Sequence, residues 1–399
     1  MKPSTTPPDR LPPNERAYRL ALETWGLSRC PGNRTDSLEP IVAALSGHFT
    51  DERPDTYTPY LNEADTLTAY ALYFAPQTYT RTVEALNGIL NRLPDFPKNR
   101  PLRILDLGSG IGSALKAAAD VINERTGNAP QCTAADWSEN ALNALKYFIP
   151  QADTIHCDLR TAVPKGPYDI ILSSFAFNEA FPNPSEAETA LRHLINALTD
   201  DSPSFVLLLE PASHRSTPRL LALRDRFHDC PLYAPCPHAG TCPMVPTQDG
   251  ICHDVRRFRP DRLMNRLNRH LHRNLSDIKY TPFALGRPGG PQAEGFSHPE
   301  YLRLVGPMDK AKGLIICRAC MGDGCLRRLE IPTAPLSADR RHALLERRRG
   351  DCAWLDGPLE YRRLLEDGRT QRTADLRFSD EAPPTLDTPP DDSGFSFSV

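Results

Sequence analysis

An aspartate followed by three closely spaced glycines is the first feature of the sequence that could bind a small molecule. Asp106 lies near the end of the apolar run LRILDL, and Gly108, Gly110 and Gly112 follow it before a helix-forming segment. This order predicts a strand, a tight turn and a helix start, as in the first unit of a nucleotide-binding α/β sheet. Glycines let the backbone turn sharply and approach a ligand, and the helix N-terminus offers free N–H groups. The Asp106 carboxylate could face a cationic group of that ligand.

Two further aspartates follow later strand-like segments. Asp136 ends the next apolar run, where its carboxylate could accept hydrogen bonds from a ribose diol. Asp158 follows a third segment, and YDIILSS and FVLLLEP supply a fourth and a fifth strand. No lysine of a Walker motif follows the glycines, and no set of residues resembles a hydrolase triad. The pattern therefore disfavours an NTPase or a hydrolase.

This succession resembles the class I S-adenosylmethionine (SAM)-dependent methyltransferase fold, whose motifs occur here as DLGSGIG, Asp136, CDL and YDIILSS. The resemblance implies an α/β fold with a Rossmann-like sheet. It also implies that Asp106 and the glycines hold the methionine end of SAM, Asp136 the ribose and Asp158 the adenine edge. The alternative is a sheet that kept its shape and lost its ligand.

The 399 residues, with a net charge of −3, suffice for two or three domains. We expect a disordered Pro-rich leader (1–13), an N-terminal helical domain that caps the sheet (14–97) and a Rossmann-like domain (98–330). The remainder (331–399) should form a basic helix and a disordered acidic tail. No run is apolar enough to span a bilayer and no signal peptide is evident, so we expect a cytoplasmic protein without membrane contact.

A Cys-rich and Pro-rich insertion (228–260) interrupts the Rossmann-like domain and is followed by a basic helix (261–274). Two later strand-like runs, Lys279–Arg287 and Lys312–Met321, are expected to close the same sheet.

Four of the eleven cysteines are candidates for a metal site. Cys236, Cys242 and Cys252 lie in the insertion, which lacks an apolar core of its own, and a reducing compartment disfavours disulfides. Cys320, at the end of the last expected strand, could supply the fourth ligand and tie the insertion to the sheet. Its competitors for that place are Cys317, Cys325, Cys230, His238 and His253.

Four thiolates suit either zinc or an iron–sulfur cluster. Zinc sites usually contain close C-x₂₋₄-C pairs, and none occurs among the three cysteines of the insertion. The wider spacing favours a cluster, with zinc as the alternative.

Basic residues gather directly after the insertion. Helical spacing places four arginines on one cationic stripe: Arg262, Arg266, Arg269 and Arg273. Leu263, Leu267 and Leu271 form a separate apolar stripe that can pack inward. Three more arginines, Arg256, Arg257 and Arg259, enlarge the patch, which favours a phosphate-rich partner such as RNA. The candidate RNA-binding residues are Arg256, Arg257, Arg262, Arg266, Arg269 and Arg273.

Several stretches, among them AYALYFAPQTYTRTVEAL, APCPHAGTCPM, ICHDVRRF and KGLIICRACMGDG, resemble the methyltransferase-like family of small-ribosomal-subunit assembly factors of bacteria and mitochondria. The resemblance covers roughly residues 65 to 330. It implies binding to a maturing small subunit and its rRNA, and a [4Fe–4S] cluster on Cys236, Cys242, Cys252 and Cys320. One departure is the absence of the family's usual aromatic residue before the third cysteine.

The leading hypothesis is a SAM-binding, iron–sulfur-containing assembly factor, monomeric off the ribosome, that acts as an rRNA methyltransferase or uses SAM structurally. The alternative is a small-molecule or protein methyltransferase with structural zinc. No catalytic base can be named, since the FNEAF segment containing Asn178 and Glu179 is not the NPPY-type signature of amino-group methylation.

Overall fold

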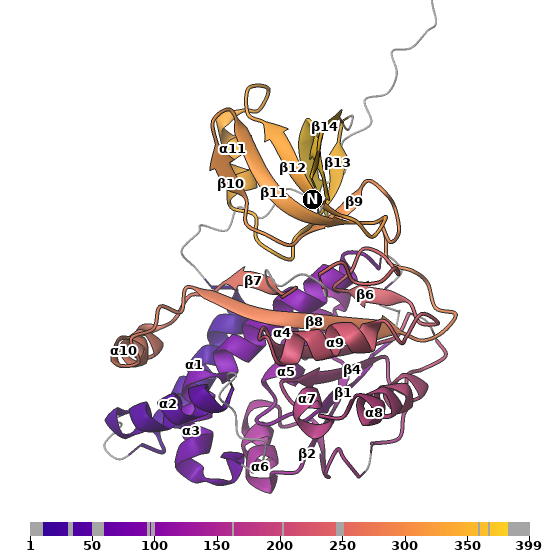
Figure 1. The fold of residues 1–399 in the computed structure, drawn as a ribbon. Coiled ribbons are helices and arrows are strands. Elements are labelled where there is room, and N and C mark those ends of the chain that lie inside the picture. The colour runs from indigo at the N-terminus through magenta and orange to yellow at the C-terminus, as the bar shows by residue number, and fades with distance from the viewer. Residues whose placement is uncertain are drawn as a thin grey trace, which may run out of the picture.

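We describe the protein from a computed structural model (Figure 1). The described residues are 11–30, 35–49, 60–93, 96, 100–161, 163–201, 203–244, 251–357, 360–365 and 368–381. Most of the predicted leader (1–13) and the end of the predicted acidic tail (382–399) lie outside these ranges.

Helices precede the first strand, in the segment for which the sequence predicts them. They are α1 (Pro13–Leu27), α2 (Glu39–His48), α3 (Ala64–Tyr73) and α4 (Ala75–Leu90), with 3₁₀ turns at Asp36–Leu38 and Tyr60–Asn62. Pro76 lies in the first turn of α4, where its missing N–H group breaks no helical hydrogen bond. Tyr18 of α1 and Leu86 of α4 share a hydrophobic core with Ile104 of the first strand. The helices are therefore a cap packed on the sheet.

The central sheet has eight strands in the order β3-β2-β1-β4-β5-β8-β6, and β7 also pairs with β8. The strands are β1 (Arg103–Leu107), β2 (Gln131–Asp136), β3 (Asp153–His156), β4 (Ile170–Ser174), β5 (Phe205–Pro211), β6 (Leu232–Ala234), β7 (Asp254–Arg257) and β8 (Asp277–Gly286). Strands β1 to β5 are parallel, and β8 runs antiparallel to β5. From β1 the strand order proceeds to one side through β2 and β3 and to the other side through β4 and β5. This change in strand order between β1 and β4 confirms the Rossmann-like α/β fold.

Helices cover both faces of this sheet (Figure 1). They are α5 (Ser113–Thr126), α6 (Glu139–Phe148), α7 (Phe177–Ala180), α8 (Pro184–Asn196) and α9 (Ser216–Arg224). Ile104 packs into the core with α1, α4 and α5, and its neighbour Leu105 packs into a second core with α8 and α9. Strand β1 is thus buried on both faces, as its continuous apolar sequence indicates.

The chain after β8 forms a second sheet that the sequence does not predict. The run Lys312–Met321 does not close the central sheet, because the short strands β6 and β7 of the insertion occupy the outer edge of β8. It forms β11 (Leu314–Met321) in a sheet ordered β14-β15-β12-β11-β9-β13-β16, with β10 on β11. The alternating burial of β11 is typical of a sheet with one core face. Leu302, Ile315 and Leu329 belong to its separate core.

The C-terminal segment also differs from the expectation of a helix and a polar tail. The basic helix exists as α11 (Ala338–Leu345), but the chain then returns to the second sheet. Its remaining strands are β9 (Tyr301–Leu304), β10 (Asp309–Ala311), β12 (Leu326–Pro332), β13 (Cys352–Asp356), β14 (Glu360–Leu365), β15 (Gly368–Arg372) and β16 (Asp375–Phe378). In Figure 1 this part, orange to yellow, stands at one end of the α/β body, next to β6 and β7.

The predicted basic helix (261–274) is shorter than expected. Helix α10 (Arg262–His270) begins after Asp261, whose side chain accepts a hydrogen bond from the N–H of Met264. It ends before His272, which has a φ of 51°. Arg273 therefore lies beyond the helix.

Candidate functional site

The glycine turn after β1 has the backbone shape that the sequence predicts. Gly108, Gly110 and Gly112 have φ values of 67°, 52° and 82°, a region that favours glycine. A Cβ atom on Gly108 would lie 2.3 Å from the Cβ of Ala176, and one on Gly112 would lie 2.7 Å from Leu145. Larger residues would thus force apart the turn and the elements packed against it.

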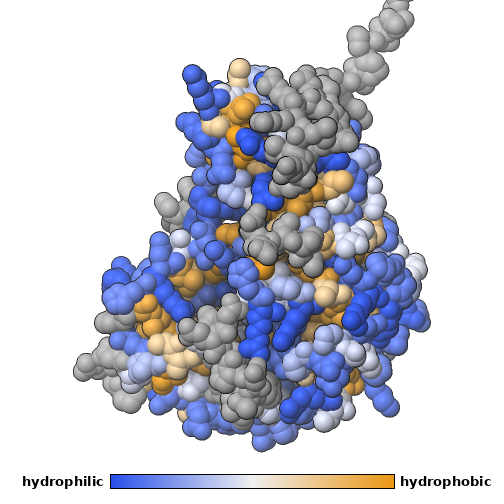
Figure 2. All heavy atoms as spheres, viewed as in Figure 1, coloured by the Kyte–Doolittle hydropathy of each residue, from blue (hydrophilic) through white to orange (hydrophobic). Residues whose placement is uncertain are grey.

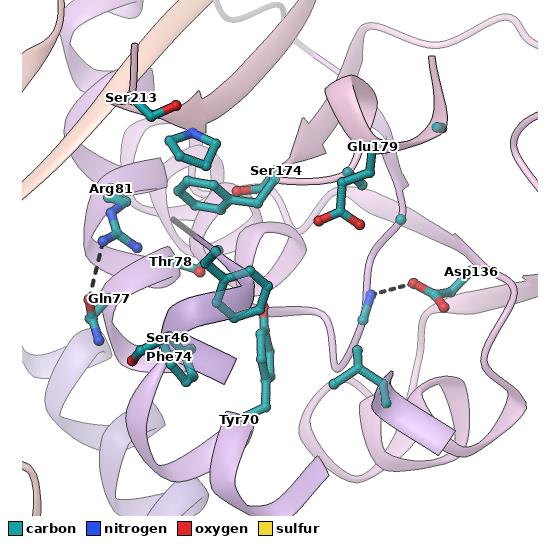
Figure 3. A pocket seen from close by; sticks show the side chains of 18 of the residues that line it. Ser46, Tyr70, Phe74, Gln77, Thr78, Arg81, Asp136, Ser174, Glu179 and Ser213 are labelled. Atoms are coloured by element: carbon teal, nitrogen blue, oxygen red, sulfur yellow. Dashed lines mark hydrogen bonds between the residues drawn. The ribbon is translucent and has the colours of Figure 1, made fainter. Parts of the chain in front are cut away.

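A cavity of about 490 Å³ opens beside this turn, within the size range of small-molecule sites. Four of the predicted SAM-binding residues border it: Gly108, Gly110, Asp136 and Asp158. Asp106 and Gly112 are not among its lining residues. Figure 3 shows Asp136 on one side of the cavity, with Tyr70, Thr78 and Arg81 on the other.

Asp136 is held in place by the turn itself. One carboxylate oxygen accepts a hydrogen bond from the N–H of Gly110 at 2.7 Å, and the other accepts from Ser138 at 2.8 Å. Burial raises the pKa of Asp136 above its ordinary value. The carboxylate is therefore fixed at the cavity wall before any ligand arrives.

Asp106 is a buried carboxylate with an unused oxygen. Its Oδ2 atom accepts a hydrogen bond from the N–H of Leu115 at 3.1 Å. Its Oδ1 atom has no partner in the described part of the chain. Burial raises the pKa of Asp106 to about 8. A cationic group beside it would stabilise the ionised form.

Asp158 is less enclosed than the other two. Its side chain forms an ion pair with Arg160 at 2.6 Å, which lowers the pKa of Asp158. It follows β3 and borders the cavity.

The opposite wall of the cavity was not anticipated from the sequence. Gln77, Thr78 and Arg81 of α4 line it, with Tyr70 of α3. Ser174, the last residue of β4, and Phe175 also line the cavity. Phe175 has a φ of 61°, which is unusual for a bulky residue. The sequence shows this part of α4 only as one face of an amphipathic helix.

The four candidate cysteines lie together although they come from distant parts of the chain. Cys236, Cys242, Cys252 and Cys320 are all buried. Burial raises the pKa of Cys320 well above its ordinary value, and the nearby charges of the other three thiols raise it further. Cys317 packs in the separate core of the second sheet, as the odd spacing from Cys320 along one strand predicts. Because β11 belongs to the second sheet, the thiol of Cys320 comes from that sheet and not from the central one, which corrects the expectation that it lies on the last strand of the central sheet.

Polar groups surround the cysteines. The Nε2 atom of His238 lies 3.3 Å from the Sγ atom of Cys320. Arg303 of β9, which is 3% exposed, points its Nη2 atom at Cys252 Sγ from 4.0 Å and pairs with Asp254. Arg224 donates to the carbonyl oxygens of His238 and Gly240, both at 2.7 Å. Within the described ranges, no group of three or more His, Cys, Asp or Glu side chains is arranged to hold a single metal ion.

The sequence has a family match that covers the four cysteines and most of the residues that line the cavity. Residues 64–339 match the model of the family described as mitochondrial small ribosomal subunit Rsm22. The chain belongs to the Rsm22 family. No curated protein matches it in sequence.

Two solved structures are similar to this Rsm22-family chain at low identity. The plantazolicin methyltransferase BpumL, in complex with a monoazolic desmethylPZN analog and SAH, is 17% identical, with 63% of this chain and 96% of that chain covered and a TM-score of 0.33. TehB from Haemophilus influenzae is 13% identical, with 50% of this chain and 62% of that chain covered and a TM-score of 0.32.

The basic residues of the Rsm22-family chain divide into an exposed and an internal group. Arg262 and Arg269 are exposed on α10, whereas Arg266 is half-buried and donates to the hydroxyl of Thr35. Leu263, Leu267 and Leu271 pack inward against α2 and α3, as predicted. Figure 2 shows hydrophilic residues over most of this face of the molecule, with smaller hydrophobic patches between them.

Two of the predicted RNA-binding arginines are placed otherwise than expected. Arg256 forms ion pairs with Glu84, Asp254 and Asp351, so its charge is neutralised inside the protein. Arg273 lies beyond α10 and borders the cavity. Arg257 is exposed but pairs with Glu346. In the described residues no helix is long and apolar enough to span a membrane.

Proposed function

We propose that this Rsm22-family protein binds SAM in the cavity beside the glycine turn and acts on the maturing small ribosomal subunit. The observation that carries the proposal is the pair of aspartates at the turn. Asp136 is fixed at the cavity wall, where its carboxylate can accept hydrogen bonds from a ribose diol. Asp106 keeps a buried oxygen without a partner, which suits the ammonium group of an amino acid.

The proposed SAM site uses the residues named from the sequence. Gly108, Gly110 and Gly112 would let the cofactor approach the backbone, and Asp158 would exchange its partner Arg160 for the adenine edge. When bound, SAM supplies an electrophilic methyl group. SAH is part of the BpumL complex that is similar to this chain, which accords with this proposal.

We propose further that Cys236, Cys242, Cys252 and Cys320 hold a [4Fe–4S] cluster. The donor set fits, because the four thiols gather in one buried region. Two buried guanidinium groups, Arg224 and Arg303, act electrostatically on these thiols. A thiolate-ligated cluster is anionic, so these cations would offset its charge.

The partner we propose is the rRNA of the small subunit, contacted by the exposed arginines of α10. The family description names that subunit. Arg262 and Arg269 are free to approach phosphates, whereas Arg256 is not. Glu179 borders the cavity, but its position does not identify the group that would accept the methyl group. Methylation of rRNA and a purely structural use of SAM therefore both agree with this site.

Calorimetry with SAM and co-sedimentation with small ribosomal subunits test the two halves of this proposal. We expect SAM binding at one site and salt-sensitive association with the subunit. Absence of SAM binding would reduce the sheet to a scaffold. Binding of SAM without any subunit association would favour the alternative, a small-molecule or protein methyltransferase. A monomer off the ribosome and a cytoplasmic location remain predictions, which sedimentation and cell fractionation can test.

A further inference from the structure

Arg81 presents a charged group to the cavity from the helical cap. It lies on α4, and its guanidinium carbon lies 5.0 Å from the centre of the Phe175 ring, just after β4. Its Nη2 atom donates to the side-chain oxygen of Gln77 at 3.1 Å, and its Nε atom is buried without a partner. Figure 3 shows Arg81 and Gln77 together on the wall opposite Asp136.

No anion neutralises this cation within the described part of the chain. Its hydrogen-bond partner Gln77 is uncharged, and no ion pair of Arg81 is present among the described residues. Burial lowers the pKa of Arg81 to about 10, so the group is still charged at neutral pH. A buried charge is unfavourable unless it is paired. The cavity therefore favours a ligand that carries a negative group on this side.

The order of the strands says which part of the ligand reaches Arg81. Asp158 follows β3, Asp136 ends β2, Gly108 follows β1 and Phe175 follows β4, and these four strands are consecutive in the sheet. A ligand with its base at β3 and its ribose at β2 extends past β1 toward β4. Its far end thus arrives between Asp106, below the turn, and Arg81.

We propose that Arg81 binds the α-carboxylate of SAM, an assignment that rests on the SAM site proposed above. Each charged group of the methionine moiety then has a partner of opposite charge, since Asp106 suits the ammonium group and Arg81 the carboxylate. Gln77 is a positioning residue, because its amide nitrogen donates to the carbonyl of Tyr73 at 2.7 Å while its oxygen holds Arg81. The helical cap therefore contributes directly to cofactor selection.

The test compares SAM with 5′-methylthioadenosine, which has the same nucleoside but no amino acid end. With the full-length protein, Arg81→Gln should weaken SAM binding by roughly 10-fold to 100-fold, the range expected for a charged hydrogen bond. Binding of methylthioadenosine should not change, which also shows that the variant is folded. Arg16→Gln is the matched control, because Arg16 is an exposed arginine on α1 of the same helical cap and is not among the residues that border the cavity, and it should leave both affinities unchanged.

A second measurement needs no variant. Wild-type protein should bind decarboxylated SAM more weakly than SAM, and Arg81→Gln should reduce or remove that difference. Equal losses for SAM and methylthioadenosine in Arg81→Gln would overturn the assignment, as would unchanged SAM affinity with weakened RNA binding, which would mark Arg81 as a phosphate contact. Wild-type protein that binds neither nucleoside would contradict the SAM site itself and the Arg81 assignment with it.

Discussion

The guanidinium group of Arg303 lies between the thiol of Cys252, 4.0 Å away, and the carboxylate of Asp254. Arg303 belongs to β9 of the second sheet, while both partners belong to the insertion beside the central sheet. One buried side chain thus joins the two sheets at the cysteine cluster. The stability of that junction and the occupancy of the cluster should therefore change together.

Arg303→Ala should strongly destabilise the protein. Asp254 and Arg303 are 5% and 3% exposed, and breaking one side of a buried ion pair lowers the free energy of unfolding by about 3–5 kcal/mol. Denaturant unfolding followed by circular dichroism measures the change. Arg328→Ala is the control on the same sheet, because the Arg328–Glu330 pair is more exposed and should contribute about 0–1 kcal/mol. Equal effects of the two substitutions would argue against Arg303 as a junction.

Asp136→Ala should weaken SAM binding. The substitution removes charged hydrogen bonds to the ribose, each worth about 1.5–3 kcal/mol, and also releases the N–H groups of Gly110 and Ser138. Asp153→Ala is a matched control, since Asp153 is exposed at the start of β3. Isothermal titration calorimetry gives both affinities. An unchanged affinity in Asp136→Ala would remove Asp136 from the site.

The turn and the aspartates could be predicted because their signals are local. Glycine spacing and the end of an apolar strand lie within a few residues of each other, and parallel strands bring their carboxyl ends to one edge. The position of Arg81 on the cavity wall could not be predicted in the same way, because it depends on the tertiary contact between α4 and Phe175, which follows β4. The prediction that Arg256 binds RNA is not supported, because the sequence shows only a basic run. The three carboxylate partners of Arg256 come from α4, from β7 and from the loop before β13. The second sheet was missed because short antiparallel strands carry weak periodic signals.

Asp106→Asn should change how stability depends on pH. The folded-state pKa of Asp106 is raised by burial from 3.8 to about 8, so between these values the folded protein holds a proton that the unfolded chain has lost. Stability contributed by this group therefore falls as pH rises through that window and levels off above it. The asparagine variant should show a flatter profile than wild type in denaturant unfolding between pH 5 and pH 8. Parallel profiles would mean that Asp106 does not titrate in this window.

Arg262→Glu combined with Arg269→Glu should weaken association with the small subunit and lower its salt dependence. Both side chains are exposed on α10, and each lost phosphate contact reduces the slope of log affinity against log salt by about one. Filter binding to rRNA at several salt concentrations measures the slope. Lys310→Glu combined with Lys312→Glu is the control with the same change in net charge, because both lysines are exposed at β10 and the turn before β11 of the second sheet. If the control and the double variant lose equal affinity, the effect is one of net charge and not of α10.

Cys320→Ser is the variant that tests the cluster and the junction together. It leaves the three thiols of the insertion intact and removes the one thiol that β11 of the second sheet supplies. We expect iron and sulfide to be lost on anaerobic purification, and the free energy of unfolding to fall because the second sheet loses its covalent connection to the insertion. Cys317→Ser is the matched control, since Cys317 lies on the opposite face of the same strand, in the separate core, and should keep full iron content.

Full iron content in Cys320→Ser would show that another residue is the fourth ligand, for which His238, 3.3 Å from Cys320, is the nearest candidate. Stoichiometric zinc without sulfide in the wild-type protein would replace the cluster by a structural metal ion.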